Sequence, residues 1–392
     1  MARVIVLGAG MVGRAMALDL ARRHDVLACD RSADALALLG REAAAQNVAR
    51  PPVTRELDVA DTDEVGAAAG GGFDLAVAAV PGFLGFRTLR AVIEAGTSVA
   101  DISFCPEDTL ELDALARERG SCALVDIGVA PGLASLILGR HDRDWNLSHF
   151  ECLVGGLPEA RTWPWQYKAP FSPVDVVQEY VRPSRLMENG RVVVRPALSE
   201  PEFVDFPGVG SLEAFNTDGL RSILTTMSHV PNMREKTLRW PGHRELVLAL
   251  RESGLLSEEP IAAVDAAGQE IQVIPREITS RVLIQEWALQ PGEPEFTAMR
   301  VTVRGVDKRT GAAREAIYLL LDRTDPATGT SSMARTTGYT CTAAAELILS
   351  GFFRAPGVHP GERLGAVPGA LDRVLAYLGE RGVQLSVTGD LA

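Results

Sequence analysis

The fold is decided by the stretch Val4-Ile5-Val6-Leu7-Gly8-Ala9-Gly10-Met11-Val12-Gly13, in which an apolar strand runs into a glycine-rich turn that opens a helix. Gly8 permits the tight turn after the strand. Gly10 lets the backbone approach a pyrophosphate, and Gly13 lets the helix pack closely on the strand. The first helical amides, from Met11 and Val12 onward, favour a bound anion. The stretch therefore predicts a dinucleotide-binding loop.

The pattern from Arg3 to Asp126 alternates short apolar runs with amphipathic stretches, which is typical of a doubly wound parallel sheet. The predicted strands are Val4–Leu7, Val26–Cys29, Val53–Leu57, Leu75–Val80, Ser98–Ile102 and Ala123–Asp126. The predicted helices are Val12–Arg22, Ala33–Ala44, Asp61–Ala69, Leu84–Ala95 and Pro106–Arg119. This strand set completes a dinucleotide-binding sheet. We therefore expect a Rossmann domain over residues 1–130.

Acidic residues at the strand ends indicate which nucleotide binds. Asp30 ends the second strand about 20 residues after the glycine loop, where a carboxylate accepts hydrogen bonds from ribose hydroxyls, which favours NAD. Arg31 comes next and could pair with a 2′-phosphate, so NADP stays open. Asp58, after the third strand, would face the adenine or cap a helix.

Three further strand ends border the expected cofactor path. Ala79 and Pro81 leave room for ribose where the fourth strand ends. Ser103 and Gly128 end the next two strands and would lie beside the nicotinamide. Ser103 could equally be a plain turn residue.

After Asp126 the alternation of strand and helix fails, which indicates a second α/β domain over residues 131–335 with a mixed or antiparallel sheet. Turn signals at Asn189-Gly190 and Lys308–Gly311 predict hairpins. These hairpins are Arg185–Arg195 and Met299–Asp322, and the predicted helices are Leu133–Gly139, Ser172–Tyr180 with Ser172 as N-cap, and Gly242–Glu252. Residues 336–392, with helices at Thr342–Ser350 and Ala370–Glu380, are expected to pack back on the Rossmann domain.

Composition narrows the function classes. The net charge of −12 and the lack of any Lys/Arg-rich run argue against nucleic acid and anionic membranes as partners, and favour a small molecule. No signal-peptide pattern or bilayer-length apolar run occurs, so we expect a cytoplasmic protein. The five cysteines show no metal-ligand spacing, so we expect reduced thiols and no metal site.

Four separated stretches resemble the saccharopine dehydrogenase superfamily: Asp126–Gly132, Tyr167–Pro173, Thr217–Arg221 and Lys236–His243. Within it the chain is most similar to the L-lysine 6-dehydrogenase branch, and the likeness extends from the glycine loop to Met333–Gly338. Saccharopine reductases usually continue the tyrosine-lysine pair with phenylalanine, serine and tryptophan, whereas this chain has Ala169-Pro170-Phe171. The resemblance implies a Rossmann domain, a second domain that binds substrate and builds an oligomer, and oxidative deamination at an amine-bearing carbon.

Hydride loss from an amine carbon requires the nitrogen lone pair, so a base must first take a proton. Lys168 is the first candidate, because a lysine partly desolvated in a cleft can have a lowered pKa. The chain uses arginine almost throughout and holds only three lysines, so a lysine marks a position where a titratable amine could be preferred. A structural ion pair is the alternative for Lys168. Asp126 could be the base, orient the amine or cap the turn into Gly128. Tyr167 would stack, donate a hydrogen bond or pack in the core.

An amino-acid substrate also needs a cation for its α-carboxylate, and a guanidinium suits this. Arg221 and Arg239 lie in the stretches that carry the resemblance, although either could be a surface ion pair. His243 could meet the substrate or a neighbouring subunit. Glu213 and Asp218 could recognise a distal ammonium, or be solvated loop acids.

These features predict an NAD(P)-dependent oxidoreductase acting on a C–N bond of an amino acid, with oxidative deamination of L-lysine at its ε-amine as the first hypothesis. Reductive condensation, as in saccharopine or carboxynorspermidine formation, is the second. A non-catalytic NAD(P)-binding sensor is the third. We also expect a homo-oligomer, because the second-domain sheet would expose an apolar face if left alone.

Overall fold

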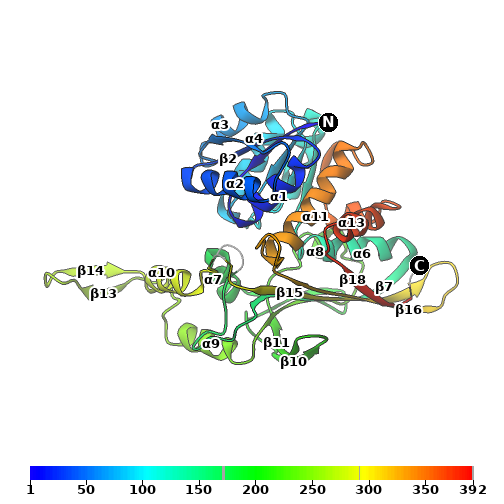
Figure 1. The fold of residues 1–392 in the computed structure, drawn as a ribbon. Coiled ribbons are helices and arrows are strands. Elements are labelled where there is room, and N and C mark those ends of the chain that lie inside the picture. The colour runs from blue at the N-terminus through cyan, green and yellow to red at the C-terminus, as the bar shows by residue number, and fades with distance from the viewer. Residues whose placement is uncertain (170–172, 291, 391–392) are drawn as a thin grey trace.

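The computed structural model describes residues 1–169, 173–290 and 292–390. Two sheets, each with its own helices, lie one above the other, and a hairpin projects to one side (Figure 1). The predicted Ser172 N-cap lies outside the described residues. No described helix combines the length and apolarity that a bilayer span requires. All five cysteines are buried and free.

The first sheet is parallel and has the order β17-β6-β5-β4-β1-β2-β3. Its strands are β1 (Arg3–Leu7), β2 (Asp25–Asp30), β3 (Val53–Glu56), β4 (Leu75–Ala78), β5 (Val99–Asp101), β6 (Cys122–Val125) and β17 (Gly357–Pro360). All six predicted strands are confirmed. The prediction that they complete the sheet is wrong, because β17 from the C-terminal segment adds a seventh strand beside β6.

The Rossmann helices are α1 (Met11–Ala21), α2 (Ala33–Ala45), α3 (Thr62–Ala69), α4 (Gly82–Glu94) and α5 (Asp113–Arg119). Side-chain caps fix two of their starts. The Ser32 hydroxyl accepts from the Ala35 amide, and the Asp61 carboxylate accepts from the Asp63 and Glu64 amides. The helix predicted to begin at Pro106 begins only at a 3₁₀ turn, Thr109–Leu112.

The second sheet is mixed, with nine strands. They are β7 (Trp145–Pro158), β8 (Ser184–Glu188), β9 (Arg191–Arg195), β10 (Glu202–Phe206), β11 (Gly210–Asn216), β12 (Met233–Arg239), β15 (Glu295–Asp307), β16 (Ala313–Arg323) and β18 (Leu385–Gly389). β12 and β7 run parallel, and the other neighbours run antiparallel. Both predicted hairpins, β8–β9 and β15–β16, are confirmed.

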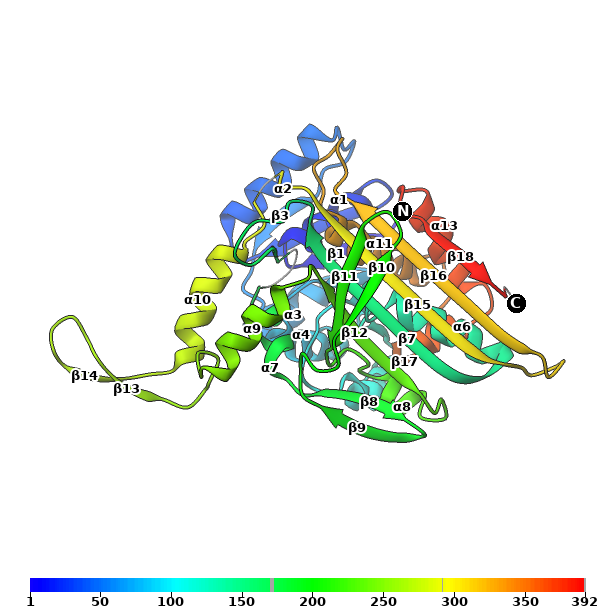
Figure 2. The ribbon, with the colours of Figure 1, turned by 90° about the horizontal axis from the view of Figure 1, so that it is seen from below.

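The helices of this half are α6 (Leu133–Asp144), α7 (Pro173–Val181), α8 (Ile223–Thr226), α9 (His243–Glu252) and α10 (Pro275–Trp287). α6 runs five residues beyond the predicted Gly139. Two short strands, β13 (Ile261–Val264) and β14 (Glu270–Val273), form a separate two-stranded sheet that stands away from the body (Figure 2).

The C-terminal segment serves both sheets. It contains α11 (Ser332–Leu349), α12 (Gly361–Gly365) and α13 (Ala370–Gly379). α11 begins ten residues before the predicted Thr342 and packs on α1, where buried Asp19 accepts hydrogen bonds from Thr342, Tyr377 and Arg381. The expected return to the Rossmann domain is therefore correct for α11 and β17, whereas β18 pairs with β16 in the second sheet.

Candidate functional site

A cavity of about 640 Å³ lies between the two sheets. Its Rossmann wall comes from the glycine loop and the carboxyl ends of the parallel strands, which is where doubly wound sheets bind nucleotides. Its other wall comes from β7, α7, the loop after β11, and β12, and includes Gly155, Glu179, Asp218, Gly219, Glu235, Thr237 and Arg239. No group of three or more His, Cys, Asp or Glu side chains in the described ranges could hold a metal ion.

The glycine loop forms an open cradle at the start of α1. Gly8 has a φ of +99°, and a Cβ there would lie 2.3 Å from the Ala79 carbonyl oxygen. A Cβ at Gly10 would meet nothing within 4 Å. Gly10, the N-cap of α1, provides no side-chain hydrogen bond to the first amides of the helix. The loop therefore fits a dinucleotide pyrophosphate, which those amides would bind.

Asp30 is fixed beside this cradle by two backbone amides. One carboxylate oxygen accepts from the Ala9 amide at 2.7 Å and the other from the Ser32 amide at 2.8 Å. Asp30, the carboxylate expected to favour NAD, and Arg31, the cation that could pair with the 2′-phosphate of NADP, both line the cavity. Asp58 also lines it, while accepting from the Ala60 amide at 2.9 Å in a turn.

Residues at the other strand ends divide into two groups. Met11, Val12, Gly13, Ala79, Pro81 and Gly128 line the cavity as expected. Ser103 does not line it. Its hydroxyl donates to Asp101 at 2.7 Å beneath α4, where Gly85 leaves room for the Ser103 side chain. Ser103 therefore takes the structural turn role.

Asp126 lines the cavity and is paired with Arg221, the two closest contacts being 3.2 and 3.4 Å. Arg221 stacks over the Phe104 ring at 4.4 Å and donates to the Cys105 carbonyl, behind the lining residues. Arg221 thus neutralises Asp126 and does not line the cavity. Nearby, burial raises the pKa of Asp101 to about 7.

Three carboxylates, Glu179, Asp218 and Glu235, gather on the second-domain wall. Asp218 pairs with Arg185 at 2.8 Å, and Glu179 pairs with Arg239 at 3.3 Å. Glu235 forms no ion pair with any residue that the structure describes. Burial, reinforced by the charges of Glu179 and Asp218, raises the pKa of Glu235 to about 8.

Close packing positions Glu235. A Cβ at Gly219 would lie 1.6 Å from a Glu235 carboxylate oxygen, so a larger residue at 219 would displace this side chain. Glu235 is consequently a desolvated acid held at the cavity wall, with a pKa in the range where a carboxylate can exchange protons near neutral pH.

Arg239 lines the cavity and is held by a chain of aromatic and polar groups. It stacks over the Tyr167 ring at 4.5 Å and donates to the Tyr180 hydroxyl at 2.8 Å. Tyr180 in turn bonds His243 Nε2 at 2.9 Å, and His243 Nδ1 bonds the Trp165 carbonyl at 2.9 Å. Burial lowers the pKa of His243 to about 3, so this histidine is neutral, donates from Nδ1 and accepts from Tyr180.

Tyr167 and His243 therefore lie behind Arg239 and do not line the cavity. Lys168 is also outside it, because its Nζ donates to the Glu286 carbonyl at 2.7 Å. Ala169 forms a bridge with Ala288, and in extended backbone alternate side chains point to opposite sides. Tyr167 and Ala169 are buried, and Lys168 points the other way.

Sequence reasoning missed Glu235 and Glu179. Glu235 belongs to the run Arg234-Glu235-Lys236, whose charges suggest a solvent-facing strand, although Glu235 and Lys236 are both buried. Lys236 forms an ion pair with Glu202 at 2.8 Å and does not line the cavity. The one available signal for Glu235 was that it directly precedes Lys236–His243, a stretch that carries the family resemblance.

Two family models match the chain. The saccharopine dehydrogenase NADP binding domain matches residues 4–124, and the saccharopine dehydrogenase C-terminal domain matches residues 128–383. Saccharopine dehydrogenase (NADP(+), L-glutamate-forming) of Schizosaccharomyces pombe is 25% identical over 305 residues, which cover 73% of this chain and 65% of that protein. Mitochondrial alpha-aminoadipic semialdehyde synthase of Mus musculus is 25% identical over 205 residues, which cover 49% of this chain and 22% of that protein. The chain thus spans less than two thirds of the length of these relatives.

Solved structures share the fold. The apo saccharopine dehydrogenase (L-Glu forming) of Saccharomyces cerevisiae superposes with a TM-score of 0.76 at 18% identity, covering 100% of both chains. The homospermidine synthase of Legionella pneumophila, solved in complex with NAD, gives a TM-score of 0.62 at 12% identity and covers 99% of this chain and 91% of that one. Because the two family models account for nearly the whole length, the chain belongs to the saccharopine dehydrogenase family, with an NAD(P)-binding domain followed by the family's C-terminal domain.

Proposed function

We propose that the chain is an NAD(P)-dependent oxidoreductase that oxidises an amine-bearing carbon of an amino acid, with the ε-amine of L-lysine as the first substrate to test. The observation that carries this proposal is Glu235, a buried carboxyl group on the cavity wall that forms no ion pair with any described cation. An alkylammonium group fits this position, because it would supply the missing positive charge.

The same residue supports the chemistry. A lysine ammonium has an ordinary pKa of about 10.4, so it must lose a proton before its carbon can release hydride. With a pKa of about 8, the Glu235 carboxylate is a stronger base than an ordinary glutamate. The ammonium proton passes to Glu235, and the electron pair of the C–H bond leaves as hydride while a C=N bond forms. Bound NAD(P) supplies the hydride acceptor. Water then adds to the imine, and ammonia leaves to give an aldehyde.

Arg239 is the residue proposed to bind the substrate α-carboxylate. Its Nε, Nη1 and Nη2 atoms already donate to Tyr180, Leu238 and Glu179, which fixes the plane of the guanidinium at the cavity wall. A planar guanidinium in a fixed orientation favours carboxylate recognition. In this proposal Asp126, already balanced by Arg221, orients the amine and Glu235 takes its proton.

Saccharopine oxidation, or the reverse condensation, is the second candidate, and the names of the matched relatives favour it. Saccharopine carries more carboxylates than lysine and would need more cations to bind them. Among the described residues, the cations that line the cavity are Arg31, at the cofactor end, and Arg239. One cation outside the cofactor end suffices for the single carboxylate of lysine and not for the several carboxylates of saccharopine, which supports lysine as the substrate.

The test is reduction of NAD and NADP by the purified full chain with L-lysine at alkaline pH, with saccharopine and linear diamines in parallel. Turnover with lysine supports the proposal, and turnover with saccharopine alone would replace it by the second candidate. A chain that binds NADH, measured by fluorescence, but turns over none of these amines would be a nucleotide-binding sensor instead.

A further inference from the structure

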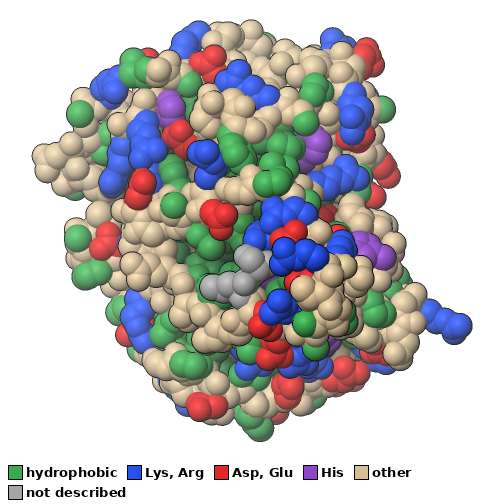
Figure 3. All heavy atoms as spheres, turned by 90° about the vertical axis from the view of Figure 1, so that its right-hand side faces the viewer, with side chains coloured by type: hydrophobic (Ala, Val, Ile, Leu, Met, Phe, Trp, Pro, Cys, Tyr) green, Lys and Arg blue, Asp and Glu red, His purple; other side chains and the backbone are tan. Residues whose placement is uncertain are grey.

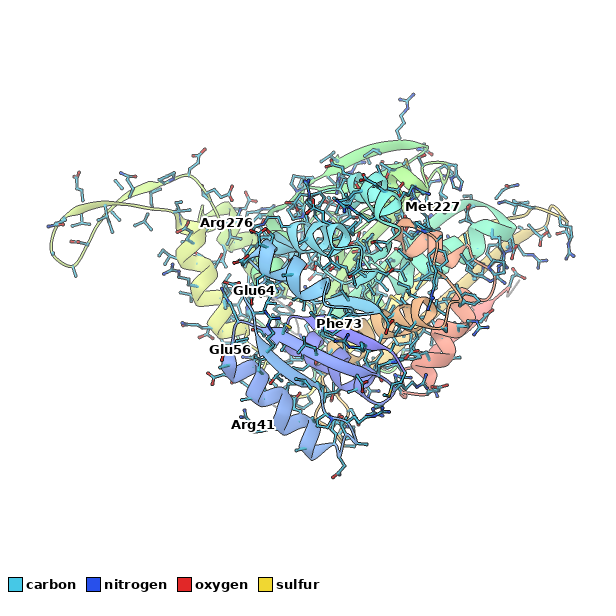
Figure 4. The ribbon with its side chains drawn as sticks, turned by 90° about the horizontal axis from the view of Figure 1, so that it is seen from above. Arg41, Glu56, Glu64, Phe73, Met227 and Arg276 are labelled. Atoms are coloured by element: carbon cyan, nitrogen blue, oxygen red, sulfur yellow. The ribbon has the colours of Figure 1, made fainter. Side chains whose placement is uncertain are left out.

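The hairpin β13–β14, called the arm below, pairs with no other strand in the described part of the chain. It forms its own two-stranded sheet, and α10 connects it to the body. Arg276, at the start of α10, marks where the chain returns from the arm to the body (Figure 4). An isolated two-stranded hairpin is only marginally stable in water, so an arm of this kind requires a surface to pack on.

Apolar side chains on the arm are exposed. Ile261 is 55% exposed and Val264 is 67% exposed, and Ile271 is exposed as well. The register pairs Ala263 with Ile271, which places Ile271 on the same face as Ile261. Ile278 and Val282 extend the exposed apolar surface along α10, whose Leu283 and Trp287 are buried against the body. Aliphatic groups concentrated on one projection indicate a protein-binding surface.

A second unpartnered surface lies at the edge of the large sheet. Among the described strands β9 pairs with β8 alone, so its other edge offers free backbone hydrogen-bonding groups (Figure 2). Val192 and Val194 on β9 are 52% and 61% exposed. Arg191 and Arg195 flank them, and Arg191 has no ion-pair partner in the described part of the chain.

The arm and the β9 edge match in length and charge. The arm strands have four residues each and β9 has five, which correspond to roughly 13–17 Å at 3.3 Å per residue. Residues 261–273 contain Asp265 and Glu270 and no lysine or arginine. β9 contains no acid, and its Arg191 is available to these acids, whereas its Arg195 already pairs with Glu188 and Glu200. We propose that the arm of one copy of this chain pairs with the β9 edge of a second copy, and that the reciprocal contact closes a two-fold dimer.

The experiment uses light scattering coupled to size-exclusion chromatography at tens of micromolar protein. An edge variant, Val192→Asp with Val194→Asp, and an arm variant, Ile261→Asp with Ile271→Asp, should each fall from twice the chain mass of 41.9 kDa to the monomer mass. Val53→Asp is the matched control, because Val53 is 67% exposed on β3, at the edge of the other sheet. This control should remain a dimer.

Mixing the two monomeric variants separates this contact from other arrangements. The edge variant keeps an intact arm and the arm variant keeps an intact β9, so a mixture retains one complete contact and should form a heterodimer. Thermal unfolding and NADH binding confirm that each variant is folded, because none of the substituted residues lines the cavity. Three outcomes would each overturn the proposal. The wild type could be monomeric, or the mixture of the two variants could stay monomeric. The edge variant could also stay dimeric, which would indicate an arm-to-arm contact.

Discussion

The glycine loop of the Rossmann wall presents backbone and small side chains to the cavity, whereas the second-domain wall presents charged side chains, of which Glu179, Asp218 and Arg239 are ion-paired and Glu235 is not. Gly8, Gly10 and Gly13 act through the space that they leave. Glu235 and Arg239 act through charge, in surroundings that exclude water. The difference implies that substitutions on the first wall change fit and stability, and that substitutions on the second change chemistry and its dependence on pH. On the face seen in Figure 3, acidic and basic side chains are interspersed, whereas Glu179, Asp218 and Glu235 lie together on the second-domain wall of the cavity.

The largest expected effect concerns the charged wall. Glu235→Gln removes the proposed proton acceptor while keeping its shape, and kcat with the amine substrate should fall about 10²–10⁴-fold. The dissociation constant for NADH, measured by fluorescence, should change little. Glu245→Gln, at an exposed position on α9, is the matched control and should keep wild-type kcat. Full activity of the Glu235 variant would remove the base from this wall.

On the glycine loop, Gly8→Ala and Gly10→Ala form a matched pair. Alanine at 8 combines a contact at 2.3 Å with a φ of +99°, so the free energy of unfolding should drop by about 3 kcal/mol. Alanine at 10 meets open space and should leave stability nearly unchanged while weakening NADH binding. Denaturant unfolding and NADH titration measure the two effects. Equal stability of the two variants would contradict the steric reading of this loop.

A pH series sharpens the contrast between the walls. A base must be deprotonated to act, so kcat/KM should rise with pH through about 8, the raised pKa of Glu235. In the folded state Glu235 keeps its carboxyl proton up to a pH of about 8, whereas an unfolded glutamate releases its proton at about 4.5. Glu235 therefore stabilises the fold at low pH, and that contribution is lost as pH rises from about 4.5 to about 8. In Glu235→Gln both the kinetic inflection and this part of the thermal-stability profile should disappear.

The smallest expected effect is on cofactor choice. Asp30→Ala should weaken NAD binding about tenfold, because a ribose hydroxyl loses a charged acceptor, and should weaken NADP binding less. Part of the loss should be common to both cofactors, since Asp30 also accepts from the Ala9 amide in the loop. Isothermal titration with each nucleotide measures the ratio. An identical loss for the two would place Asp30 in a purely structural role.

The two walls also differed in how far the sequence predicted them. A local signal, an apolar strand ending in glycine or aspartate, sufficed to predict that the loop, Asp30 and Gly128 lie at the cavity, because each follows directly from the end of its own strand. The roles of Lys168 and Glu235 depended instead on which side of an extended segment faces the cavity. That orientation is set by neighbours such as Ala288 and Gly219, which are distant in sequence. β17, four residues long and completed only by pairing with β6, was missed for the same reason.

The C-terminal segment has a mechanical consequence. The chain crosses between the two sheets three times: after β6, between β16 and β17, and between α13 and β18. One covalent linker would leave the halves free to twist about it, whereas three restrict them to a small opening along a common axis. Ligands should therefore enter and leave through a narrow hinge movement, in which Asp30 on the Rossmann wall and Glu235 on the second-domain wall separate by a limited distance and return to the same relative position.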